Sequence, residues 1–116
     1  MTTRVRWTYV CRTDSIVANT GVCAKVGAAQ VALFRVVPPA GEEIVYAIGN
    51  VDPKSGASVL ARGLVGDLQG EIVVASPVYK QHYSLATGRC LEDESLSVPV
   101  HAVRVIDGMV LVRESS

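Results

Sequence analysis

The chain has 116 residues, which is a usual size for one folded domain. Hydrophobic residues make up 49% and charged residues 19%, a composition typical of a folded protein rather than a disordered tail. Eleven basic and eleven acidic residues give a formal net charge of zero, so no broad positive field is available to hold nucleic acid or an anionic membrane surface. We therefore predict a single domain over residues 1–116, with no nucleic-acid partner and no membrane partner.

Short apolar runs and widely spaced cysteines indicate the compartment. Runs such as "IVVA" and "MVLV" are far shorter than the roughly 20 residues needed to cross a bilayer, and the N-terminal "MTTRVRWTY" has no apolar signal core. The three cysteines, Cys11, Cys23 and Cys90, are odd in number and form no CxxC pattern, which suits reduced thiols better than a disulfide framework. We expect a cytoplasmic protein.

Short β-rich segments separated by turn residues run through the chain and favour a mostly β, antiparallel fold. A first strand is predicted at 6–12. Strands at 30–36 and 43–48 flank the Pro- and Gly-containing "VPPAGE" and should form a hairpin. A second hairpin is predicted from "HAVRVI" and "MVLVRE", because the intervening Asp107 and Gly108 suit a two-residue type I′ turn.

Glycine and proline interrupt the segment between the two hairpins, which predicts a loop-rich lobe at about 49–90 that includes the strand "EIVVA". Near the N-terminus, Trp7 and Tyr9 alternate along one face of the first strand, and we predict that both pack in the core. The acidic "LEDES", 91–95, is predicted to be a solvated turn, with a docking patch for a basic partner as the alternative.

Residues of catalytic or metal-binding type are present without the spacing that such sites need. His82, Cys90 and His101 have no paired ligand spacing, so Cys90 is predicted to be packed rather than metal-bound. Ser76 lacks the GxSxG elbow of an activated serine, although His82 and Asp67 supply the other residue types of a triad. The glycines at 63, 66 and 70 match no phosphate-binding loop and are predicted to serve turns. We predict no catalytic residue.

Two loops share a layout in which a strand runs into a residue-Pro turn: "VYAIGNVDPKSGASVL" and "VVASPVYKQHYSLATGRCL". This layout resembles the Rieske domain, in which two such loops each give one Cys and one His to a two-iron, two-sulfur cluster. The second loop also resembles that family in the tail that follows its ligands, here Tyr83, Ser84, Leu85, Thr87 and Gly88. The resemblance implies a Rieske-like antiparallel β sandwich with the loop-rich lobe inserted.

The resemblance places other residues at the four cluster-ligand positions. Asp52 and Lys54 are at the positions of the first Cys and His, while Ser76 and Tyr79 are at the positions of the second Cys and His. An ammonium has no lone pair, and Ser and Tyr hydroxyls titrate too high to replace thiolate or imidazole. No cluster, other cofactor or metal is therefore expected in this chain.

A narrower resemblance covers most of the chain. The stretch from Asp52 to Asp93, above all "RGLVGD" and "ASPVYKQ", resembles the small subunit of the assimilatory NAD(P)H-dependent nitrite reductase, whereas 14–27 shows little beyond a polar connection. The resemblance implies a large-subunit partner that carries flavin, siroheme and iron-sulfur centres and uses NAD(P)H to reduce nitrite to ammonium. This chain would be its accessory, non-catalytic subunit.

Two roles can be suggested for the two loops that lack the cluster ligands. We hypothesise that Asp52, Lys54, Ser76 and Tyr79 fill the cluster space with a polar network, the alternative being that each faces water. Because the loop tips of Rieske proteins face the redox partner, the same tips are predicted to dock on the large subunit, with Tyr79 as the anchor. The candidate contact residues are Pro53, Lys54, Tyr79, Lys80 and Gln81.

Two other functional classes fit the same sequence. One is an electron carrier with an atypical cluster, which would show visible absorption and bound iron. The other is a freestanding β domain that binds a small molecule or a protein unrelated to nitrite, since one fold hosts many functions.

Overall fold

Three antiparallel sheets build the protein, for which a computed structural model describes residues 5–39 and 41–114. The first sheet has the order β1-β10-β9, from Trp7–Arg12, Met109–Arg113 and Val103–Ile106. The second has the order β2-β3-β4-β8, from Thr20–Val26, Ala29–Val36, Ile44–Gly49 and Val100–His101. The third, β5-β6-β7, comprises Leu64–Leu68, Glu71–Ala75 and His82–Ser84.

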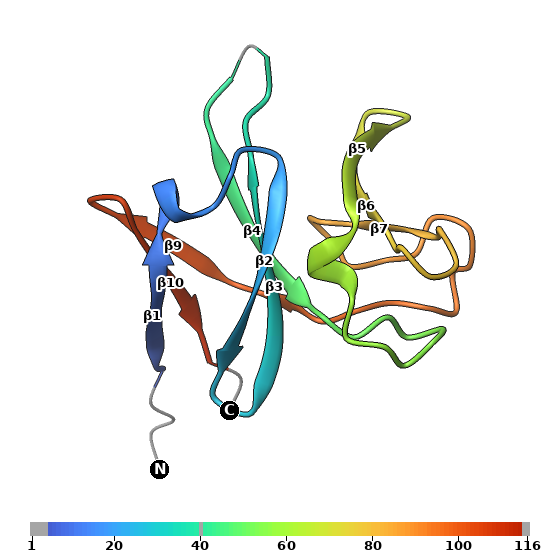
Figure 1. Cartoon of the computed structure of the whole chain (residues 1–116), viewed down its shortest axis with the longest axis horizontal. Helices are drawn as coiled ribbons and strands as arrows, with labels where there is room; N and C mark the ends of the chain where they lie inside the picture. Colours follow the sequence, from blue (N-terminus) through green and yellow to red (C-terminus); the bar gives the residue numbers. More distant parts are fainter. Residues whose placement is uncertain (1–4, 40, 115–116) are drawn as a thin grey trace.

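The second sheet lies between the other two (Figure 1). Side chains of β3 alternate between two cores: Val31 and Leu33 pack with Val110 and Val112 of β10, while Phe34 packs toward Tyr83 of β7. Burial on both faces explains why β3 reads as a nearly continuous apolar run, "VALFRV". The mostly β, antiparallel fold class is confirmed.

Short helical turns and a glycine link the sheets. Two 3-10 segments, η1 at Thr13–Ser15 and η2 at Leu60–Arg62, are the helical elements of the described ranges, and neither has the length or apolar character to span a bilayer. Next to the third sheet, Gly88 takes a φ of +79°, and its N–H donates to the Ser84 carbonyl at 2.8 Å. A Cβ there would lie 2.1 Å from the Val98 carbonyl oxygen, so only glycine fits.

Most of the predicted strands are confirmed. Both hairpins form, and Asp107 and Gly108 have φ values of 51° and 77°, the two positive φ values expected of a type I′ turn. The strands predicted at 6–12 and at "EIVVA" correspond to β1 and β6.

Two predictions about the first 27 residues are wrong. The segment 14–27 contains the seven-residue strand β2, which pairs with β3 along its whole length. Trp7 and Tyr9 do share a face of β1, but that face points away from the core, and Tyr9 is 53% exposed. The residues that β1 sends into the core are Val10 and Cys11, which a β-bulge between Tyr9 and Cys11 brings to the same side.

Candidate functional site

The candidate site is where two loops meet at the end of the third sheet: the first loop, 50–59, follows β4, and the second loop, 76–81, joins β6 to β7. Each loop closes on itself through backbone hydrogen bonds. In the first, the Gly56 N–H donates to the Asp52 carbonyl at 2.7 Å, and the Asp52 N–H donates to that of Ala57 at 2.8 Å. In the second, the Ser76 N–H donates to the Gln81 carbonyl at 2.8 Å. Hydrogen bonds between backbone groups of the same loop thus hold each loop closed.

Asp52 and Ser76 join the two loops. Both side chains are buried, at 0% and 1% exposure, and the Ser76 hydroxyl donates to Asp52 Oδ2 at 2.5 Å. The other carboxylate oxygen, Oδ1, accepts from the Lys54 backbone N–H at 2.8 Å and from the Tyr83 hydroxyl at 3.3 Å. A buried carboxylate is therefore surrounded by three hydrogen-bond donors, which is the arrangement that a buried charge requires.

The surroundings shift the pKa values of Asp52 and Tyr83 in opposite directions. Burial by itself raises the pKa of Asp52, but the hydrogen bonds from Ser76, the backbone and Tyr83 outweigh it, and the net pKa lies below the ordinary value. Burial, and then the negative charge of Asp52, raise the pKa of Tyr83. Asp52 is thus held as the carboxylate while Tyr83 stays protonated as a donor.

Lys54 and Tyr79 meet at the surface instead of in the buried network. The Lys54 ammonium lies 5.1 Å from the centroid of the Tyr79 ring, a cation–π contact, and Tyr79 is 55% exposed. The hypothesis of one polar network holds for Asp52 and Ser76, whereas Lys54 and Tyr79 form a separate pair at the loop tips. The four positions are brought together as two layers, one buried and one exposed.

His82 and Cys90 both contact the carboxylate of Glu92. The His82 ring Nδ1 lies 2.6 Å from Glu92 Oε2, and the Cys90 thiol donates to Glu92 Oε1 at 3.7 Å. His101 lies on β8 opposite Ala47. Within the described ranges no group of three or more His, Cys, Asp or Glu side chains is placed to hold a metal ion. Cys90 is 4% exposed, so its predicted packing is confirmed.

The triad that residue types alone would allow does not form. Ser76 donates to Asp52 and not to a histidine, and Asp67 accepts from the Gly70 N–H in the β5–β6 turn. Gly70 has a φ of +83°, which confirms the prediction that this glycine forms part of a turn. Gly66 lies within β5 instead, which makes the prediction wrong for that residue.

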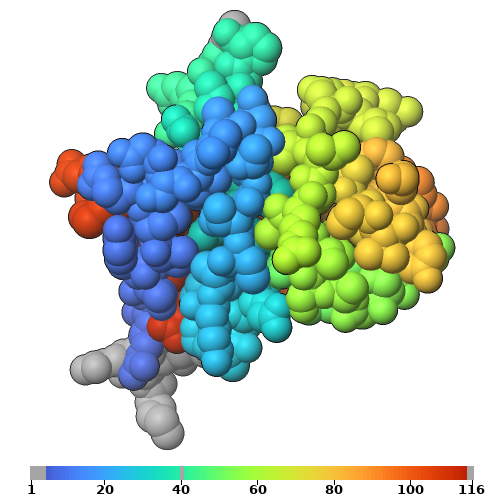
Figure 2. Space-filling model, viewed as in Figure 1, coloured from blue at the N-terminus to red at the C-terminus, as the bar shows by residue number. Residues whose placement is uncertain are grey.

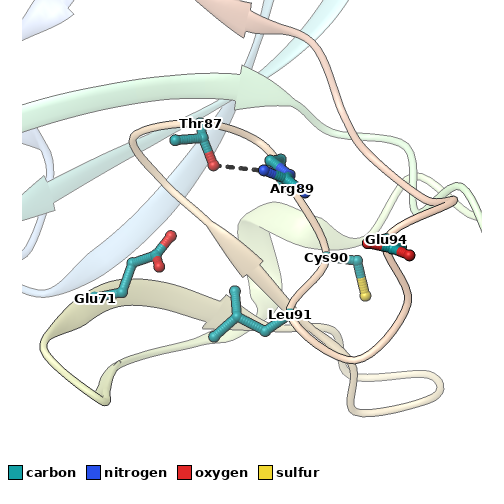
Figure 3. Close-up of a pocket in the computed structure, with 6 residues that line it drawn as sticks. All are labelled: Glu71, Thr87, Arg89, Cys90, Leu91 and Glu94. Carbon is teal, nitrogen blue, oxygen red and sulfur yellow. Dashed lines mark hydrogen bonds between the residues drawn. The ribbon is translucent and has the colours of Figure 1, made fainter.

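A pocket of about 330 Å³ opens between residue 71 of β6 and the segment 87–94, which follows β7 (Figure 3). Its walls mix acidic, basic and apolar groups: Glu71, Thr87, Arg89, Cys90, Leu91 and Glu94. In Figure 3 the carboxylates of Glu71 and Glu94 lie on opposite sides of Leu91 and do not converge on one point. The pocket therefore offers no set of ligands for a cation.

Three residues of the site were not predicted from the sequence: Tyr83, Asn50 and Glu92. Tyr83 belongs to the tail that carried the Rieske resemblance, and its position on β7 could have suggested an inward side chain. Asn50 fixes η2 by accepting from the Ala61 N–H at 2.8 Å. Glu92 lies in the acidic stretch that is predicted to be a solvated turn, but it also accepts from the His82 backbone N–H at 2.7 Å. Their partners lie 10 to 31 positions away, beyond the reach of local patterns.

Comparison with known proteins identifies the class. Residues 6–113 match the family of the Rieske-like [2Fe-2S] domain, and the chain belongs to that family. The NMR structure of the E. coli protein NirD superimposes with a TM-score of 0.87 at 45% identity, covering 97% of this chain and 100% of that one.

Within this class the chain belongs to the family of nitrite reductase small subunits. It is 48% identical over 108 residues to the nitrite reductase (NADH) small subunit of Salmonella typhimurium, which is 93% of this chain and 97% of that protein. It is also 42% identical over 106 residues, or 91% of the chain, to 11% of a Klebsiella oxytoca protein named nitrite reductase [NAD(P)H] large subunit.

The residues at the cluster positions do not fit the two-iron, two-sulfur cluster that the class name implies. Ser76 uses its hydroxyl proton to bond Asp52 across the 2.5 Å between them, so both side chains already satisfy one another. The Lys54 ammonium has no lone pair, and the Tyr79 ring is engaged by that ammonium. The donor set lacks the thiolates and imidazoles that such clusters use.

Proposed function

We propose that this chain is the accessory small subunit of an NAD(P)H-dependent nitrite reductase that reduces nitrite to ammonium in the cytoplasm. The flavin, siroheme, iron-sulfur centres and NAD(P)H site belong to the large subunit, and this chain, as a single domain, is not catalytic on its own. The observation that carries the proposal is the 48% identity to a nitrite reductase small subunit over 97% of that protein's length.

The Klebsiella oxytoca protein supports the large subunit as the partner. A segment like this chain makes up 11% of that polypeptide, so a domain of this kind exists covalently joined to the rest of a nitrite reductase large subunit. Joining two partners in one chain keeps them at high effective concentration, which is useful when they work in contact.

The loop tips are the surface that we assign to this contact. Pro53, Lys54, Tyr79 and Lys80 are exposed and Gln81 is half-buried, so four of the five candidate residues are accessible to a partner. Val51 and Val78, at 42% and 44% exposure, add apolar area beside them. The Lys54 contact holds the Tyr79 ring in place, which lowers the entropy lost when that ring is immobilised in an interface.

Electron transfer through this chain is not part of the proposal. Asp52 and Ser76, at two of the four positions that the resemblance assigns to cluster ligands, form a hydrogen bond and have no redox chemistry, so we infer that the domain contributes binding and positioning. Electrons pass from NAD(P)H to nitrite within the large subunit.

A pull-down from nitrate-grown cells tests the proposal. The tagged chain should bring down a polypeptide that has the absorption of siroheme and flavin and nitrite-dependent NAD(P)H oxidation. Tyr79→Ala should weaken this association at least about tenfold while the domain stays folded. Val17→Ala is the control, because Val17 is 72% exposed and lies outside both loops. Recovery of the chain without that polypeptide would overturn the proposal and favour a freestanding module.

A further inference from the structure

The outer face of the β1-β10-β9 sheet is an exposed surface that the loop tips do not include. Residues directly opposite in an antiparallel pair share a face, so the register places Trp7 with Arg113, Tyr9 with Leu111, and Arg104 with Leu111 on one side. The alternate residues Val110 and Val112 are fully buried on the other side. We define the outer face as Trp7, Tyr9, Arg12, Arg104, Ile106, Met109, Leu111 and Arg113.

The outer face has the composition of a protein-binding surface. It holds the single tryptophan of the chain, and Tyr9, Ile106 and Met109 are 53%, 48% and 38% exposed. Aromatic residues, Met and Arg are the types enriched in interfaces, and Trp, Tyr and Arg supply most hot spots. The Arg104 guanidinium lies 4.4 Å from the Trp7 ring, which stiffens both side chains before any partner arrives.

Charge on the outer face indicates the kind of partner. The chain has no net charge, yet three arginines lie here, Arg12, Arg104 and Arg113. In the part of the chain that the structure describes, one salt bridge involves them, between Arg12 and Asp14 at 3.7 Å. A two-fold pairing of two copies through this face would set arginines against arginines, which is unfavourable when they are desolvated. The surface that complements the outer face therefore carries carboxylates around an apolar centre.

We propose that the outer face docks on a carboxylate-bearing apolar surface of the nitrite reductase large subunit, as a second contact separate from the loop tips. This inference rests on the proposed function. The first sheet and the lobe lie on opposite sides of the central sheet (Figure 1), and in the space-filling view they form opposite flanks of the molecule (Figure 2). The large subunit then holds the domain from two sides, which fixes its orientation as well as its attachment.

Affinity of the purified chain for the purified large subunit tests the proposal, with Ile106→Asp and Arg104→Glu as the variants. Both residues are exposed, so the variants should fold, and circular dichroism and thermal unfolding verify this. Ile44→Asp is the matched control, because Ile44 is a strand residue of the same type at 43% exposure on a different sheet. We expect each outer-face variant to weaken binding at least tenfold and the control to bind as the unchanged chain does. Raising the salt concentration should weaken the unchanged chain more than Arg104→Glu.

Each remaining outcome is decisive. If the unchanged chain binds and both variants bind equally well, the outer face is free and the inference is wrong, while the proposed function stands. If the unchanged chain does not bind the large subunit at all, both fail. If sedimentation shows a dimer of this chain that Ile106→Asp dissociates, the outer face pairs with a second copy, and the inference is overturned.

Discussion

The Ser76 hydroxyl donates a 2.5 Å hydrogen bond to the buried carboxylate of Asp52 and so ties together two loops that are 24 residues apart in the chain. In a cluster-bearing Rieske domain the metal would make this connection. Here one hydrogen bond to a charged acceptor makes it, so the connection depends on two side chains.

Ser76→Ala should therefore destabilise the domain by about 1.5–3 kcal/mol, because the Asp52 carboxylate loses a donor where water cannot replace it. Urea unfolding followed by circular dichroism measures this. Ser95→Ala is a matched control, since Ser95 also donates to an aspartate, Asp93, at 2.6 Å but on an exposed turn. That variant should change the unfolding free energy by less than about 0.5 kcal/mol. Equal changes in unfolding free energy for the two serine variants would mean that the buried hydrogen bond contributes no more to stability than the exposed one.

Acid should act on the domain through Asp52. The folded-state pKa of Asp52 is lowered, so its contribution to stability is fully present above the unfolded-state pKa, about 3.9, and is lost as the pH falls through the folded-state pKa. Asp52→Asn should lower stability at neutral pH and flatten the fall in unfolding free energy as the pH drops below the unfolded-state pKa of about 3.9. Asp67→Asn, at an exposed residue of β5, is the comparison variant. An unchanged slope in Asp52→Asn would show that other carboxylates govern acid unfolding.

His101 should produce a second pH dependence nearer neutrality. Burial lowers the pKa of His101, although a hydrogen bond with the Arg113 backbone opposes this in part, and ring Nε2 is buried with no hydrogen-bond partner among the described residues. The folded state thus prefers the neutral ring, and stability declines as the pH falls below the unfolded-state value of about 6.5. Between pH 7.5 and pH 5.5 the unchanged chain should lose more unfolding free energy than His101→Gln. Parallel curves would contradict this.

Gly88→Ala should be the most damaging of the small substitutions. The new Cβ would clash with the Val98 carbonyl oxygen in addition to straining a backbone with a φ of +79°. Gly56→Ala measures the backbone strain without the clash, because Gly56 has a φ of +77° and open space around it. We expect Gly56→Ala to cost about 1–2 kcal/mol and Gly88→Ala at least about 3 kcal/mol, measured by chemical unfolding. Similar costs would show that the turn relaxes away from Val98.

Local patterns predicted the hairpins because turn chemistry is local. Asp107 and Gly108 specify a type I′ turn by their tolerance of positive φ, whatever packs around them.

Strand β2 could not be predicted in the same way. It does have alternating inward residues, Val22, Ala24 and Val26, but they are small and the strand lies at the edge of its sheet. Gly21 weakened the strand pattern further, yet a Cβ there would lie 2.6 Å from the Phe34 ring, so the glycine serves packing.

The inward or outward direction of β1 could not be read from its own sequence. Both faces carry apolar residues, Trp7 and Tyr9 on one and Val10 and Cys11 on the other, and the bulge breaks the period of two. For the site, the resemblance located Asp52 and Ser76, and the structure supplied their mutual hydrogen bond and the third member, Tyr83. Such pairings depend on register between distant segments, which alternation within one strand does not encode.

The Asp52–Ser76 connection also bears on how the protein matures in the cell. A Rieske domain that needs its cluster waits for iron and sulfide to be delivered, and oxidants that attack the cluster can return it to an unfinished state. Where an aspartate and a serine of the chain join the two loops, that connection needs no delivered iron or sulfide. We therefore expect the folded domain to accumulate during iron starvation, when enzymes built on metal centres become scarce.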